Sequence, residues 1–378
     1  MKQITPYFAK SFYLLGDSLD YCFNCPYCRE GWVQDEEFAI HTLPSEINPN
    51  FINLPVGVNM FYGDPMIQVE NTVALLRRLE RAHHKGPVLI TTKGDYSKFP
   101  DEPFDLDLYI SFSAFGKTCR YDGGSMERLK SNLSQLKKRK NNYKHFIEYR
   151  PICYGINDDD QSINSVLDLA KEYGLVVGYC GLQGRPENIA WWESKGYDFK
   201  PFPGFELDFK KNLSDEFVKR IEQAAKERGV ILKRKTSCII STISKKRDYN
   251  AHYFRPNEVG CYDCPNREIC FNFKNSLSTN QDLTNIIPFN HTIVKKDHHE
   301  CIMLKNGSCK FPTPDCGNIS GTFVKIDKRI TTSDVRVIKW LTGMTVIADF
   351  YHSNRISDEW FKNKELLANF DKKSSIYH

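Results

Sequence analysis

The sequence has no long hydrophobic run. No apolar stretch approaches the roughly 18 residues that a membrane-spanning helix needs, so we expect neither a membrane span nor a membrane partner. The opening Met-Lys-Gln-Ile-Thr-Pro starts no apolar segment of signal-peptide length, and this favours a cytoplasmic location. The sequence also lacks internal repeats and low-complexity tracts.

A large excess of one charge is missing too. The 52 Lys and Arg residues face 47 Asp and Glu residues, and the net charge of +5 permits a polyanionic partner without requiring one. Hydrophobic residues make up 40% of the chain and aromatic residues 13%, which disfavours disorder, collagen and coiled coil. The length of 378 residues is typical of two domains, or of one large barrel with an appendage.

Short apolar runs alternate with helix-period segments over the first two thirds of the chain. This alternation is typical of βα units around a parallel sheet or barrel. The segments 67–84, 162–173 and 214–229 show the periodicity or capping residues of helices. We predict strands near residues 11–16, 56–61, 88–92, 107–113, 145–150 and 175–180.

The composition changes near residue 236. Seven of the thirteen cysteines fall between Cys238 and Cys316, among Asn, Asp, Pro and Lys. Close-spaced thiols in a reducing compartment more often hold a metal or cluster than a disulfide. We therefore predict a barrel domain at 1–235, a cysteine-rich α+β module at 236–330 and a C-terminal helical cap at 331–378.

Three cysteines, Cys22, Cys25 and Cys28, follow the first predicted strand with two residues in each gap. A structural zinc site needs four ligands, usually as two separated pairs, so three thiols in one turn fit zinc poorly. The bacterial ferredoxin run starts in the same way, but its fourth cysteine position is Trp32 here. A four-iron cluster on three cysteines leaves one iron open to an outside ligand.

This loop resembles that of the radical S-adenosylmethionine (radical SAM) superfamily, whose members build a partial (β/α)6 barrel of the TIM type. The first gap holds two residues, whereas three are commonest in the superfamily. Gly63-Asp64-Pro65 is similar to the superfamily's Gly-Glu-Pro stretch, which contacts the cofactor's amino group, and Tyr27 stands where an aromatic residue contacts adenine. The resemblance implies further cofactor contacts at strand ends, at Thr92, Ser111, Ser113, Arg150, Gly181 and Leu182.

A radical SAM enzyme, if the resemblance holds, reductively cleaves S-adenosylmethionine at a [4Fe-4S] cluster. The resulting 5′-deoxyadenosyl radical abstracts hydrogen from a substrate, while the protein orients the reactants. The resemblance implies an electron donor such as a flavodoxin or ferredoxin. It leaves the substrate open, with peptide, protein or nucleic-acid modification favoured. For Ser111, Ser113 and the Gly63–Pro65 turn, a structural role is the alternative.

A second cysteine set contains Cys261, Cys264 and Cys270, with Cys238 upstream. Its C-x2-C-x5-C core resembles part of the SPASM auxiliary-cluster domain, although the next cysteine of that pattern is Lys274 here. The resemblance implies a second [4Fe-4S] cluster, with Cys238 as the fourth ligand, and zinc is the alternative. Whether Cys301, Cys309 and Cys316 form a third site stays open.

Two further functions compete with a radical enzyme. Zinc held by the second cysteine set, together with the basic and aromatic residues of 233–253, would suit a nucleic-acid-binding protein. Clusters without cofactor cleavage would make the chain an iron–sulfur electron carrier. The missing fourth cysteine at Trp32 and the ordered strand-end motifs favour the radical enzyme.

Overall fold

The computed structural model describes most of the first two thirds of the chain and parts of the last third. The described residues are 10–12, 56–58, 64–81, 83–117, 126–141, 143–182, 186–204, 212–248, 252, 264–272, 287–296, 321–331, 334–335, 338, 345–351, 357 and 359. No helix in these ranges is both long and apolar enough to cross a membrane.

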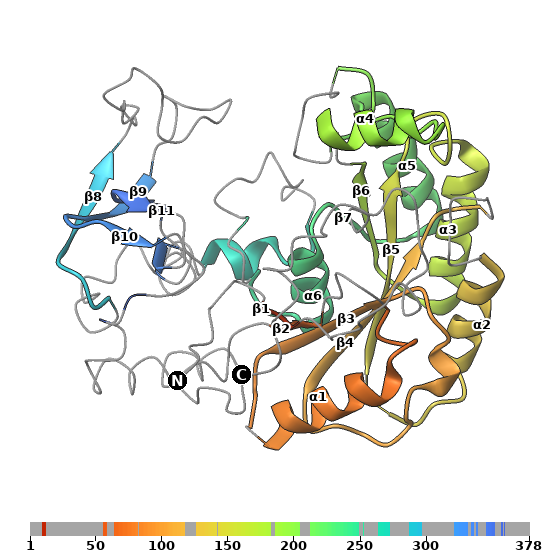
Figure 1. Ribbon diagram of the computed structural model, residues 1–378, viewed down its shortest axis with the longest axis horizontal. Coiled ribbons are helices and arrows are strands. Elements are labelled where there is room, and N and C mark those ends of the chain that lie inside the picture. Colours follow the sequence, from red (N-terminus) through yellow and green to blue (C-terminus); the bar gives the residue numbers. More distant parts are fainter. Residues whose placement is uncertain are drawn as a thin grey trace.

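A seven-stranded parallel sheet organises the larger part of the structure (Figure 1). Its strands follow one another in sequence order, which confirms the βα alternation read from the sequence. Closure into a partial barrel stays a prediction, since no described pairing joins the first strand to the last. The strands are β1 (Lys10–Phe12), β2 (Val56–Val58), β3 (Pro87–Thr92), β4 (Asp107–Ala114), β5 (Lys144–Ile152), β6 (Val177–Gly181) and β7 (Leu232–Lys233).

Helices connect β2 to β3, β4 to β5, β5 to β6 and β6 to β7, and most of them pack on one face of the sheet. Alternate residues of β4, Ile110, Phe112 and Ala114, point into a common core with buried residues of the helices. Asp159 caps the start of α3 and Ser214 that of α5, as each side chain accepts a backbone N–H of the first turn. The helices are α1 (Val69–Arg81), α2 (Met126–Leu136), α3 (Asp160–Tyr173), α4 (Pro186–Ser194) and α5 (Asp215–Arg228).

The opposite face of the sheet is covered by α6 (Thr236–Ser244), which lies across the sheet from α2 and α3 in Figure 1. Ile239 and Ile240 pack against Tyr109 of β4 and Phe146 of β5, near the N-terminal ends of these strands. The predicted boundary at residue 235 thus separates α6 from the sheet with which it shares a core. Cys238 lies in the first turn of α6.

Small sheets follow in the last third of the chain. Strands β8 (His291–Lys296), β9 (Gly321–Ile326) and β11 (Thr345–Ile347) form a three-stranded sheet, and β10 (Ile330–Thr331) pairs with β12 (Phe350–Tyr351). Both sheets join residues on either side of the predicted boundary at residue 330. Strands therefore occur in the segment 331–378, where we expected a helical cap, although its described residues also include helical positions.

The contact between α6 and the sheet yields a first prediction. Gly178 of β6 lies so close to α6 that an added Cβ would meet Ile239 Cδ1 at 2.6 Å. We expect Gly178→Ala to lower the free energy of unfolding by about 1–3 kcal/mol, because the added methyl overpacks this core. Ile239→Val removes the clashing Cδ1 methyl and should cost about 0.5–1.5 kcal/mol alone.

Denaturant unfolding of both single variants and the double variant measures the coupling. The double variant should lose less stability than the sum of the single changes, since one change relieves the strain of the other. Strictly additive losses would contradict close packing of α6 on β6.

Candidate functional site

The predicted cofactor residues gather at the carboxyl edge of the parallel sheet. Because the strands are parallel, their C-terminal ends share one edge, where βα barrels build active sites. Thr92, Ser111, Ser113, Arg150, Gly181 and Leu182 lie in or directly after β3, β4, β5 and β6, and Asp64 and Pro65 follow β2. Outside the described residues lie Cys22, Cys25, Tyr27, Cys28, Gly63, Cys261, Cys301, Cys309 and Cys316.

The Asp64 carboxylate fastens the turn after β2 to the end of β3. One oxygen accepts the Met66 N–H at 2.8 Å and the Thr92 hydroxyl, and the other accepts the Lys93 N–H at 2.6 Å. Thr92 Oγ1 in turn accepts the Gly94 N–H at 2.8 Å. The side chains of Asp64 and Thr92, both predicted to contact the cofactor, thus bind each other and the local backbone.

The backbone of this turn is engaged as well. The Asp64 carbonyl accepts the N–H groups of Ile67 and Gln68, and the Pro65 carbonyl accepts the Thr72 hydroxyl. Burial raises the pKa of Asp64, against the lowering effect of the donors at Lys93, Thr92 and Met66. The structure therefore gives this turn a structural role, and its contact with a cofactor ammonium group stays a prediction.

A second buried carboxylate, Glu148 of β5, lies on the face of the sheet that carries α6. It accepts the Ser111 hydroxyl at 2.8 Å and the Thr236 hydroxyl at 2.6 Å, and it forms an ion pair with Arg150. Only 2% of the Glu148 side chain is exposed, so these donors offset a large desolvation cost. Ser111, Glu148, Arg150 and the N-terminus of α6 thus form one polar network.

The end of β5 reaches towards the exposed edge of this network. The Arg150 side chain is 32% exposed, and the Ser113 hydroxyl contacts the Arg150 carbonyl at 3.4 Å. Asn157, in the loop after β5, accepts the Cys153 N–H and donates to the Phe115 and Pro151 carbonyls. Arg150 therefore presents a partly exposed cation at the carboxyl edge, while Asn157 holds the loop behind it.

The end of β6 is packed rather than open. The Leu182 N–H donates to the Ile152 carbonyl at 2.9 Å, and Leu182 is buried with Trp192 and Cys153. Gly181 pairs with Ile152 in the register of β5 and β6. The Leu182 amide is thus used within the sheet, and the predicted adenine contact at this strand end stays untested.

The described members of the second cysteine set lie beside α6 and β7. Lys233, which is only 6% exposed, donates to Cys264 Sγ at 2.8 Å, and Cys270 Sγ accepts the Asp248 N–H at 3.4 Å. Asn266, between the two cysteines, donates to the Ser241 and Lys246 carbonyls at the end of α6. The loop of Cys264 and Cys270 is therefore fixed to α6, and burial raises the pKa of the Cys270 thiol.

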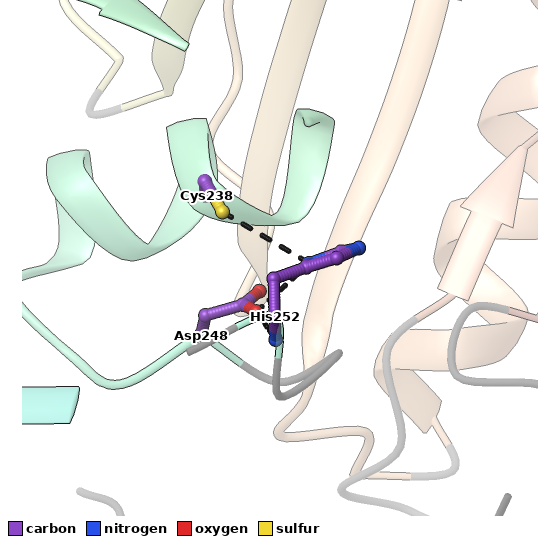
Figure 2. A group of neighbouring side chains, drawn as sticks. All are labelled: Cys238, Asp248 and His252. Atoms are coloured by element: carbon purple, nitrogen blue, oxygen red, sulfur yellow. Dashed lines mark hydrogen bonds and ion pairs between the residues drawn. The ribbon is translucent and has the colours of Figure 1, made fainter. Parts of the chain in front are cut away.

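Cys238 lies beside two side chains that the sequence did not suggest as its neighbours. Its Sγ lies 3.9 Å from Nδ1 of His252, and Oδ2 of Asp248 lies 2.9 Å from the same nitrogen (Figure 2). Candidate ligand atoms of the three side chains all lie within 4.8 Å of one another. Burial raises the pKa of Asp248, but hydrogen bonds and the charge interaction with His252 bring it below its usual value. Asp248 is therefore a carboxylate at neutral pH.

Sequence reasoning missed Glu148, Asp248 and His252. Glu148 gives no local signal, because a lone acidic residue in an apolar strand shows its partners only when β4, β5 and α6 come together. The Asp248-x3-His252 spacing was a signal, since the two residues stand four positions apart and Asp248 follows Cys238 by ten residues. Basic residues nearby were read as a possible nucleic-acid surface, yet Lys233 and Arg247 are buried.

The Asp64 contacts predict a stability effect. Asp64→Asn replaces one carboxylate oxygen with a donor amide, which leaves a buried N–H or hydroxyl without its acceptor. We expect a loss of about 1–3 kcal/mol in the free energy of unfolding. The matched change Asp105→Asn, at a side chain 77% exposed, should stay within about 0.5 kcal/mol. Equal effects of the two changes in denaturant unfolding would show that the Asp64 contacts do not hold the turn.

Comparison with known proteins gives a distant structural neighbour. No protein-family model matches the sequence, and no curated protein matches it. Among solved structures, the chain is similar to a radical SAM methyltransferase from Sphaerobacter thermophilus, with a TM-score of 0.34 and 18% sequence identity. The match covers 48% of this chain and 50% of the methyltransferase, so the chain spans about half of that protein. A likeness of this extent does not assign the chain to a family.

Proposed function

We propose that this chain is a radical SAM enzyme that modifies a peptide, a protein or a nucleic acid. The observation that carries the proposal is the three-cysteine loop, which lacks a fourth cysteine at Trp32. The loop follows β1, whose C-terminal end belongs to the same sheet edge as Arg150 and Ser113. The bound cluster and S-adenosylmethionine would supply a 5′-deoxyadenosyl radical, with electrons from a flavodoxin or ferredoxin.

The donor set fits such a cofactor. Cys22, Cys25 and Cys28 supply three thiolates, the ligands that iron–sulfur clusters require. Arg150 is a partly exposed cation suited to a carboxylate such as that of the methionine moiety. The Glu148 contact orients the guanidinium, and α6 covers the apolar part of the same face, away from this edge. In this proposal the chain binds the cofactor at the carboxyl edge of the sheet. At the amino-terminal ends of the strands, α6 keeps water from the same face.

The three-cysteine loop predicts the loss of one activity. Single changes of Cys22, Cys25 or Cys28 to Ala should each abolish reductive cleavage of S-adenosylmethionine, because each removes a ligand from the cluster. The measurement is 5′-deoxyadenosine released by anaerobically reconstituted protein under reductant. Cys153→Ala, in the apolar cluster with Trp192, is the matched control and should retain cleavage.

Retention of cleavage in all three variants would overturn the proposal. A wild-type protein that cycles between oxidised and reduced clusters without releasing 5′-deoxyadenosine would instead be an electron carrier. A colourless wild-type protein with zinc and strongly salt-dependent nucleic-acid binding would support the zinc-stabilised alternative.

Arg150 predicts a binding effect. Arg150→Gln should weaken S-adenosylmethionine binding roughly tenfold or more, the effect of losing a charge-assisted hydrogen bond of about 1.5–3 kcal/mol. The iron content should not change. Equilibrium binding to the reconstituted protein measures the effect, with Arg220→Gln on α5 as a control that should bind normally. Unchanged affinity in Arg150→Gln would remove Arg150 from the cofactor site.

A further inference from the structure

Cys238, Asp248 and His252 form a compact group on the α6 side of the sheet (Figure 2). Cys238 lies in the first turn of α6, Asp248 lies four residues beyond the end of α6, and His252 follows four positions later. Thiolate, carboxylate and imidazole are the three side-chain types that bind zinc in proteins. The group therefore has the side-chain types of a zinc site. Its geometry decides between a metal site and a hydrogen-bonded group.

The contacts of His252 distinguish a metal site from a catalytic relay. In a Cys–His–Asp relay, the thiol and the carboxylate contact opposite nitrogens of the imidazole ring. Here Asp248 Oδ2 at 2.9 Å and Cys238 Sγ at 3.9 Å both face Nδ1, and Ser237 Oγ lies 3.2 Å from it as well. An Nδ1–H group would donate to the nearest acceptor, Asp248 Oδ2, whereas one cation among the three side chains would be bound by the thiolate, the carboxylate and the imidazole together.

The separations are close to those around a tetrahedral ion. Metal–ligand distances of about 2.0–2.3 Å place neighbouring ligand atoms about 3.3–3.8 Å apart, and all ligand atoms of this group lie within 4.8 Å. The Asp248 carboxylate is also held in place, since its Oδ2 accepts the His252 backbone N–H at 2.6 Å. Only small side-chain shifts would be needed to close the three ligands around an ion.

We propose that Cys238, Asp248 and His252 bind a single divalent zinc ion. The fourth position of the ion is left to water or to a further group. The proposal does not rest on the radical SAM function, because it uses none of the residues of the carboxyl edge. The zinc site assigns Cys238 to Asp248 and His252 and not to the other three cysteines of the second set. An auxiliary cluster on Cys261, Cys264 and Cys270 would then need another fourth ligand.

Metal binding to the full-length protein tests the site. Apoprotein prepared with a chelator is titrated with Co2+, which reports tetrahedral thiolate coordination by its visible absorption, and zinc then competes for the site. We expect one high-affinity equivalent per chain in the wild type. Cys238→Ser, Asp248→Asn and His252→Gln should each weaken binding at least tenfold. His252→Gln is the most informative change, because this side chain is 22% exposed and its loss is the least disruptive to folding.

Two variants serve as matched controls. Cys264→Ser removes a neighbouring thiol that contacts Lys233, and His291→Gln removes a histidine of β8. Both should bind Co2+ like the wild type. Zinc should raise the melting temperature of the wild type and of both controls, but not that of His252→Gln.

Two results would overturn the proposal. One is wild-type Co2+ affinity in His252→Gln and Asp248→Asn. The other is loss of the tetrahedral signal in Cys264→Ser with retention in His252→Gln, which would place the ion among the cysteines of the second set. Neither result would bear on cleavage of S-adenosylmethionine, so failure of the zinc site and failure of the radical enzyme are separable.

Discussion

The buried carboxylate of Glu148 joins the parts of the molecule on which any chemistry at the sheet edge depends. A carboxylate with 2% exposure is stable only when donors surround it, and here they come from three elements: Ser111 of β4, Arg150 of β5 and Thr236 of α6. The same contacts fix the start of α6 against the sheet and orient the one partly exposed arginine of the network. Ile239 and Ile240 pack against Tyr109 and Phe146, on the side of this polar network nearer the N-terminal ends of the strands. Removing the anion would therefore disturb both α6 and the carboxyl edge.

The sequence predicted the sheet well because its signals are local. Apolar runs bounded by capped helices place β3 to β6, and Ser214 and Gly229 mark the two ends of α5. The end of that regular pattern suggested a domain boundary at residue 235, but α6 packs on the face of the sheet opposite the other helices. Its Ile239, Ile240 and Ile243 pack on the sheet, and such a contact between distant segments has no local periodicity.

The sequence indicated which types of residue lie at the strand ends, but it did not indicate what those residues contact. Strand-end polar residues were identified, yet Asp64, Thr92 and Ser111 are engaged by one another or by Glu148. Cysteine spacing indicated a metal centre near residues 238–270 but gave no reason to include Asp248 and His252. Spacing reports which thiols are close in sequence, whereas the partners of Cys238 depend on how the chain turns after α6. Three-dimensional contacts thus give these residues partners that the sequence does not reveal.

The position of α6 has a consequence for synthesis of the chain. Leu89, Tyr109 and Phe146 belong to strands made long before α6, and they pack against Ile239 and Ile240 of that helix. Until residue 244 leaves the ribosome, these side chains form an uncovered apolar surface on a nearly finished sheet. The nascent sheet is therefore exposed to aggregation during this interval, and a chaperone that binds apolar surface would act there. A chain ending at residue 235 would keep that surface permanently.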